Sequence, residues 1–247
     1  MGDLVWNVLR VGAFFMVVPI FGNRLVSRRI RMALSFAVAL ALTPMLPIGL
    51  NLADFDFAHL TALITHIVFS LGLGFSAAIF FQLFVVAGQF IGMQMGLGFA
   101  AMVDPGNGVQ VTVWSQFFLM LVTLSFLAIN GHLLLLEILI RGYQIIPPLT
   151  EVDLPTFSYQ LVLMGGWMFM GGVLMAIPAV IALLIVNLAF GIMNRSAPQL
   201  NVFALGFPFS LIFGIIVIWM LLDSFSDQFL RLVDAFFDLV MTMGPLV

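Results

Sequence analysis

Residues 88–108 read GQFIGMQMGLGFAAMVDPGNG, and they give the strongest indication of how this chain folds. Gly88, Gly92 and Gly96 recur every four residues, which places them on one face of a helix. Because glycine has no Cβ, such a face lets a neighbouring backbone come very close. The run then stops at Asp104-Pro105-Gly106, residues that are typical of a turn. The stretch predicts a close-packed wall that ends in a loop, which indicates a seal between helices and not a catalytic pocket.

The composition of the chain indicates a membrane protein. Of its 247 residues, 63% are hydrophobic and only 8% are charged, and the mean hydropathy is +1.23. Soluble domains carry about 25% charged residues, so these charges are too few to cover a soluble fold. The net charge is −3 and every basic residue is arginine, which leaves no basic field for nucleic acid. The absence of cysteine excludes disulfides, thiol catalysis and thiolate metal sites.

The apolar runs predict an all-α polytopic integral membrane protein of about six long, partly broken helices. A bilayer core of about 30 Å needs about 20 helical residues. The predicted spans are 4–22, 32–50, 60–103, 113–140, 161–193 and 202–222. The third is too long for one crossing, so we expect it to tilt, break or double back, with the glycine cluster from Gly88 as the place. Pro178 predicts a kink within the fifth span.

Charge placement gives an orientation. The loop 23–31 carries four of the eight arginines and is therefore expected on the cytoplasmic side. With six spans, the acidic loop 51–59 and both termini fall on the other side. The first span begins with an acid, Asp3, and has no basic region before it, so it is expected to be a retained helix.

The tail 223–240 is predicted to be amphipathic. Its charged residues recur at spacings of three and four and share one stripe: Asp223, Asp227, Arg231, Asp234 and Asp238. Phe229, Leu232, Phe236, Leu239 and Val240 lie opposite. The stripe either lines a watery passage or contacts a partner, or it is simply a solvated face.

No set of polar residues forms a catalytic, cofactor-binding or metal-binding motif. His59 and His66 share a helix face but have no third ligand with them. Arg10 lies in the first span without an acid at helical spacing, so it either snorkels to the interface or pairs with another helix or subunit. Glu137 and Arg141 are four apart, which indicates mutual neutralisation or a proton relay. The methionines around 93–102 indicate either core packing or a deformable gasket.

Three segments resemble the FliR/SctT family of type III export-apparatus membrane proteins. They are GQFIGMQMGLGFAAMVDPG at 88–106, FLAINGH at 126–132 followed by Ile146-Pro147, and NLAFGIMNRSAPQLNVFALGFP at 187–208. They occur in the family's order and spacing, and with the hydropathy they cover essentially the whole chain. The form of 88–106 favours the flagellar branch over the injectisome branch.

The resemblance implies a subunit without enzymatic activity or cofactor, in the bacterial inner membrane at the flagellar basal body. Family members assemble with FliP and FliQ in a helical hetero-oligomer that forms the channel for unfolded flagellar substrates, with FlhB and FlhA as further partners. It also implies an FliP-like part at 1–160. Residues 161–247 would then form an FliQ-like helical hairpin and the C-terminal amphipathic helix.

The resemblance places a plug in the channel at about 95–111. Its predicted residues are Met95, Phe99, Met102, Asp104, Pro105, Gly106, Asn107 and Gly108, while Gly88, Gly92 and Gly96 are predicted to pack helices closely. The candidate polar contacts between subunits are Arg10, Gln89, Gln94, His132, Glu137, Arg195, Gln199, Asp227 and Arg231.

Two other functions are compatible with parts of the sequence. An injectisome homologue would share the same architecture. A secondary transporter for a small solute would carry repeated halves and paired charges near the bilayer midplane. The sequence has no convincing repeat and few deep charges, so the export-gate interpretation is favoured.

Overall fold

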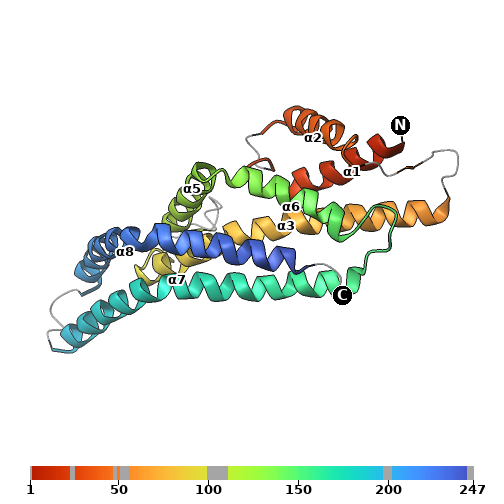
Figure 1. The fold of residues 1–247 in the computed structure, drawn as a ribbon. Helices are drawn as coiled ribbons and strands as arrows, with labels where there is room; N and C mark the ends of the chain where they lie inside the picture. The colour runs from red at the N-terminus through yellow and green to blue at the C-terminus, as the bar shows by residue number, and fades with distance from the viewer. Residues whose placement is uncertain are drawn as a thin grey trace. The chain divides into compact units, whose positions relative to one another are not determined.

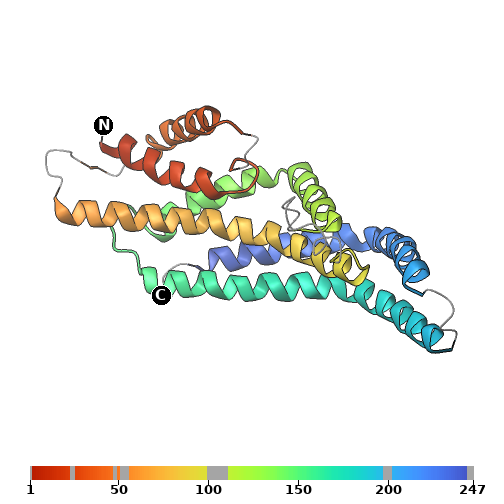
Figure 2. The ribbon, with the colours of Figure 1, turned by 180° about the vertical axis from the view of Figure 1, so that it is seen from behind.

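The computed structural model describes residues 2–22, 26–46, 49–50, 56–98, 111–196 and 202–243. Within these ranges the chain forms seven helices and no strand, which confirms the all-α class (Figures 1 and 2). The helices are α1 (Gly2–Val17), α2 (Arg28–Leu42), α3 (Phe57–Gln94), α5 (Val113–Ala128), α6 (Gly131–Ile145), α7 (Leu154–Ser196) and α8 (Val202–Met241).

The helices α3, α7 and α8 are long and apolar enough to cross a membrane, and α5 with α6 would add a fourth crossing if they count as one broken span. The prediction of a polytopic membrane protein is therefore confirmed. Helices α1 and α2, at 16 and 15 residues, are not among these candidates, so the described part of the chain supports three or four crossings and not the six predicted. Both helices end just before a proline, Pro19 and Pro44, which cannot continue the backbone hydrogen bonding.

Two of the predicted spans, 60–103 and 113–140, differ from the helices in the structure. Helix α3 runs through Gly88 and ends at Gln94, within the glycine cluster where a break was expected. Helix α7 is continuous through Pro178, and the kink predicted there stays a prediction. The predicted span 113–140 is instead two helices, α5 and α6. Between them Asn130 adopts a left-handed conformation with φ of +59°, which Asn tolerates better than most residues.

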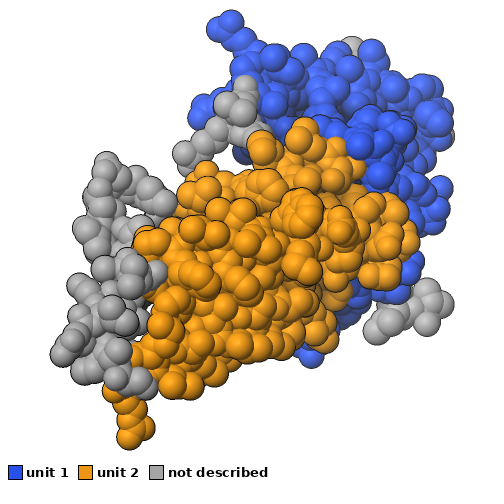
Figure 3. Space-filling view, turned by 90° about the vertical axis from the view of Figure 1, so that its left-hand side faces the viewer, with its two compact units in different colours: residues 1–80, 126–166, 235–247 blue, residues 81–125, 167–234 orange. Residues whose placement is uncertain are grey.

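The chain forms two compact units, coloured separately in Figure 3. Unit 1 comprises residues 1–80, 126–166 and 235–247, and unit 2 comprises 81–125 and 167–234. Each unit has its own buried aromatic core. Unit 1 buries Trp6, Phe14, Phe69, Phe80 and Phe126, whereas unit 2 buries Phe84, Phe118, Phe225 and Phe229. The division into FliP-like and FliQ-like parts at residue 160 stays a prediction.

The C-terminal part of α8 has the two faces that the sequence predicts. Phe225, Phe229, Val233, Phe236 and Val240 are buried, at spacings of three and four residues. The stripe of charged residues from Asp223 to Asp238 is exposed along its whole length. The amphipathic prediction is confirmed, and the role of the stripe stays open.

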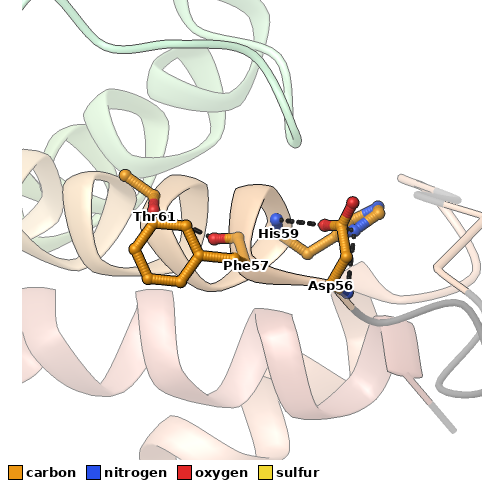
Figure 4. A network of polar contacts seen from close by, with 4 residues as sticks. All are labelled: Asp56, Phe57, His59 and Thr61. Carbon is orange, nitrogen blue, oxygen red and sulfur yellow. Dashed lines mark hydrogen bonds and ion pairs between the residues drawn. The ribbon is translucent and has the colours of Figure 1, made fainter.

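Helix α3 begins with a reciprocal cap (Figure 4). The His59 backbone N–H donates to Asp56 Oδ1 at 2.9 Å, and the Asp56 N–H donates back to His59 Nδ1 at 3.4 Å. This is the geometry of a capping box with histidine in the position usually held by glutamate. The hydrogen bond from the His59 backbone holds the pKa of Asp56 below its ordinary value.

Candidate functional site at the end of helix α3

The C-terminus of α3 lies in unit 2 and is closed by a backbone turn at Gly96. The Leu97 N–H donates to the Gly92 carbonyl and the Gly96 N–H to the Met93 carbonyl, both at 3.0 Å. These are the two bonds of a Schellman motif, which needs a left-handed residue at its centre. Gly96 has φ of +85°, a conformation that costs a side-chain-bearing residue energy. Gly96 therefore ends the helix, and the prediction that it shares a helix face with Gly88 and Gly92 is wrong.

The other two glycines bring the start of α5 against α3. A Cβ on Gly88 would lie 2.6 Å from the Trp114 carbonyl oxygen and 2.7 Å from the Ser115 Cα. A Cβ on Gly92 would lie 2.6 Å from Thr112 Oγ1. Because real Cβ atoms do not approach other atoms so closely, only glycine permits this contact at both positions.

Three polar residues, Gln89, Thr112 and Ser115, join α5 to the glycine face, and we call them the clasp. Gln89 Oε1 accepts the Thr112 backbone N–H at 2.9 Å and lies 3.1 Å from Ser115 Oγ. Thr112 Oγ1 lies 3.2 Å from the Gly88 carbonyl, to which it donates, and accepts the Ser115 N–H at 3.3 Å as the N-cap of α5. The turn that ends α3 and the start of α5 are therefore both bonded to the last turns of α3.

Helices α7 and α8 hold the other side of this helix end. Asn187 Nδ2 donates to the Gln94 carbonyl at 3.2 Å, and Ser210 Oγ donates to Asn187 Oδ1 at 3.2 Å. Met95 is 1% exposed, and its thioether occupies the space where a Cβ on Gly214 would stand, 2.7 Å from the sulfur. A flexible thioether against a glycine fills space without a fixed shape. Three helices therefore converge on the end of α3.

Of the predicted plug residues, only Met95 falls among the described residues. Phe99, Met102, Asp104, Pro105, Gly106, Asn107 and Gly108 lie outside them, as does Gln199.

Two of the predicted contacts between subunits are made within the chain. Gln89 belongs to the clasp, and Arg10 is 1% exposed inside unit 1. Arg10 Nη2 donates to the Gly142 carbonyl at 2.6 Å and Nη1 to the Ile146 carbonyl at 3.2 Å. Its guanidinium also lies 3.9 Å from the centre of the Tyr143 ring. These predictions are corrected for both residues, since their polar groups are used by neighbouring helices of the same chain.

The remaining candidates are accessible to different degrees. Arg195, Asp227 and Arg231 are exposed, and Gln94 and His132 are half-buried. Glu137 pairs with Arg141 at 2.7 Å one helical turn away, as the mutual-neutralisation interpretation expects. Whether any of them meets another subunit stays a prediction.

His59 and His66, which share a helix face in the sequence, lie in different environments in the structure. His59 caps α3, whereas His66 is buried and its Nε2 lies 3.1 Å from the Thr150 carbonyl. Among the described residues no group of three His, Cys, Asp or Glu could hold a metal ion.

Sequence reasoning missed Thr112, Ser115, Asn187, Ser210 and Gly214. Thr112 and Ser115 have the spacing of an N-cap and its third residue just before an apolar run, which is a usable signal. Asn187 is a polar residue in an otherwise apolar helix. Ser210 and Gly214 carry no signal of their own, because their role depends on what α3 places against them.

Comparison with known protein families shows which family this chain belongs to. The family model for bacterial export proteins, family 1, matches residues 1–236. The chain belongs to this family. Its relatives include the flagellar biosynthetic protein FliR of Escherichia coli K12, 36% identical over 85% of this chain and 80% of the relative, and that of Pectobacterium carotovorum, 33% identical over 95% and 90%. FliR of Bacillus subtilis is 30% identical over 85% of this chain and 82% of its own length.

Membership in this export family confirms the resemblance found in the sequence. Its proteins are structural components of the export apparatus and not enzymes. With its apolar spanning helices, the chain is a membrane-embedded component of the flagellar export apparatus.

Proposed function

We propose that this chain forms, with FliP and FliQ homologues, the channel through the bacterial inner membrane for unfolded flagellar substrates, and that it contributes the plug. The plug is the end of α3 together with residues 99–110. One observation carries the proposal: the residues on either side of this segment are fixed to the same two turns of α3, by the Schellman turn and by the clasp. The described residues that flank the segment on either side, Leu97 and Thr112, both contact Gly92, so both ends of a plug at this position would be anchored to one part of α3.

The proposed mechanism is steric. The clasp consists of neutral hydrogen bonds, each worth about 1 kcal/mol net, so releasing it costs little compared with unfolding a helix. Met95 and the glycines can repack because they carry neither charge nor rigid shape. The sequence has no lysine and hence no Walker motif, so energy for opening comes from the partner machinery, including FlhA and FlhB homologues.

The exposed apolar helices support an assembly with other chains. In the most apolar stretch of α3, 67% of residues are buried, compared with 22% in α7 and in α8. The exposed faces of α7 and α8 must be covered by lipid or by other subunits, because apolar surface of this extent is not stable in water. A gate subunit meets this need with partner helices, whereas a solute transporter would purify alone or as a homo-oligomer.

Deleting residues 104–110 tests the plug directly. The variant should still assemble with co-expressed FliP and FliQ homologues, because the clasp and the Schellman turn remain. The cell membrane should then become leaky to ions, measured as loss of membrane potential. A variant that assembles but adds no conductance would contradict the proposal.

A cross-linking experiment tests whether the segment faces the passage. The chain has no cysteine, so a single cysteine can be introduced at Phe99 or Met102 without background. We expect these variants to cross-link to an export substrate stalled in the channel. Cysteine at Val162, which is 72% exposed on α7, is the control and should not react with substrate. Equal labelling at all three positions would count against a plug.

A further inference from the structure

An apolar groove of about 700 Å³ lies in unit 1, away from the end of α3. Helix α1 contributes Leu9, Gly12 and Met16, α2 contributes Met32 and Phe36, and α3 contributes Ile67 and Leu71. Met16 and Met32 are 66% and 64% exposed, so the groove is open on one side. A Cβ on Gly12 would meet nothing within 4 Å, which shows free space along its wall.

The groove has a charged end. Arg28 and Arg31 line it in the first turn of α2, and the apolar Met32 and Phe36 follow along the same helix. The first turn of α2 holds no acidic residue, and the N-terminus of a helix is itself positive. The potential at this end therefore favours an anion, while the rest of the groove favours hydrocarbon.

We propose that this groove binds one anionic glycerophospholipid, with its phosphate at Arg28 and Arg31 and an acyl chain along Gly12, Met32 and Phe36. A molecule with an anionic head and an apolar tail matches both parts of the groove. A partner helix would match the apolar part but would need an acid at one end. Residues 23–31, which include the first turn of α2, hold half of the arginines. The positive-inside rule predicts the cytoplasmic side for them, where anionic lipids are found. The proposal does not depend on the plug.

Lipid titration tests the headgroup. The full chain, co-purified with its FliP and FliQ homologues and stripped of lipid in detergent, is titrated with dioleoylphosphatidylglycerol or dioleoylphosphatidylcholine and followed by native mass spectrometry. We expect about tenfold or more preference for the anionic lipid, since each arginine near the headgroup contributes roughly fivefold. R28Q/R31Q should abolish this preference, and R29Q, in the same turn but not lining the groove, should keep it. Equal binding of the two lipids, or equal loss in R29Q, would overturn the proposal.

A second variant tests the acyl chain. A Cβ on Gly12 would meet no atom within 4 Å, so Gly12→Leu should extend into the groove, leave the fold intact and remove binding of phosphatidylglycerol. Gly165→Leu is the matched control, because Gly165 also faces open space but lies outside the groove. Retained lipid in Gly12→Leu would overturn the proposal. So would a cysteine at Phe36 that cross-links to a partner subunit in the assembled complex, since the occupant would then be a protein.

Discussion

Helices α6 and α3 satisfy their last carbonyl groups in different ways. In unit 1 the end of α6 is held by a guanidinium from another helix: Arg10 donates to the carbonyls of Gly142 and Ile146. In unit 2 the carbonyls at the end of α3 are taken by the backbone turn at Gly96 and by the neutral amide of Asn187.

The difference indicates which helix end can move. Pulling Arg10 away would leave a buried charge without its hydrogen bonds, and the Gly142 carbonyl would keep only the bond from the Ile146 N–H. Leaving a buried charge unpaired is strongly unfavourable. Moving the end of α3 exposes only glycine, methionine and neutral amides, and these lose much less. We infer that the Arg10 region is a fixed anchor and that the end of α3 is the deformable part. The first three predictions below each test one side of this contrast, and the fourth concerns the helix starts.

The largest effect is expected at Arg10. Arg10→Leu removes the two guanidinium hydrogen bonds to the Gly142 and Ile146 carbonyls. It should lower the free energy of unfolding by about 3–5 kcal/mol, since each charged hydrogen bond contributes roughly 1.5–3 kcal/mol. Arg10→Lys keeps the charge but not the forked geometry, so the stability of this variant should lie between that of the unmodified chain and that of Arg10→Leu. The measurement is thermal unfolding in detergent, with the exposed Arg195→Gln as control. Unchanged stability in Arg10→Leu would contradict the inference that the Arg10 region is a fixed anchor.

The next effect is expected on the glycine face. Gly88→Ala places a methyl group against the backbone of α5 and should destabilise the chain by about 1–3 kcal/mol. Gly166→Ala is the matched control: it lies within α7, has nothing within 4 Å of its Cβ, and should be neutral or stabilise by up to about 1 kcal/mol. If the two variants unfold at the same temperature, the close contact is unimportant.

A smaller effect is expected at the turn that ends α3. Gly96→Ala forces an alanine into a left-handed conformation and should cost about 1–2 kcal/mol, while Gly96→Asn should cost less. The readout is faster hydrogen exchange of the Leu97 amide, which donates to Gly92. Gly98→Ala, where no left-handed backbone is required, should exchange as the unmodified chain does. Faster exchange in both alanine variants would show that the turn itself is not responsible.

The smallest effect concerns pH. The pKa of Asp56 is lowered by the His59 backbone hydrogen bond, and the pKa of Asp153 is lowered by its hydrogen bonds to Thr156. Because both folded-state values lie below those of the unfolded chain, their stabilisation is present above the ordinary aspartate value of about 4 and is lost as the pH falls through the folded values. The first turns of α3 and α7 should therefore exchange amide protons faster under strong acid. Asp56→Asn retains a cap oxygen but cannot titrate, so this variant should remove the response at α3 alone.

Several features could be predicted from the sequence because they depend on local chemistry. The apolar runs predicted the helices, and the spacing of the aspartates predicted the exposed stripe of α8. The third span does break within the glycine cluster, as expected, but at Gly96 and not at Gly88. A glycine weakens a helix by only about 1 kcal/mol, and the close packing of Gly88 against α5 outweighs that cost. Arg10 shows where prediction from sequence ends. The sequence indicated that a buried arginine needs a partner, but it could not identify the two carbonyl groups, which lie more than 130 residues away along the chain.

The sequence by itself determined that this chain is a helical membrane protein whose glycine-rich centre ends in a turn. Composition and periodicity decide these features, since they act over a few residues at a time. Only the tertiary structure decided that Gly88 receives α5, that Asn187 reaches the end of α3 and that Arg10 closes α6. Those contacts join helices far apart in the chain, and each depends on whether backbone and side chain fit in space, which no local pattern encodes.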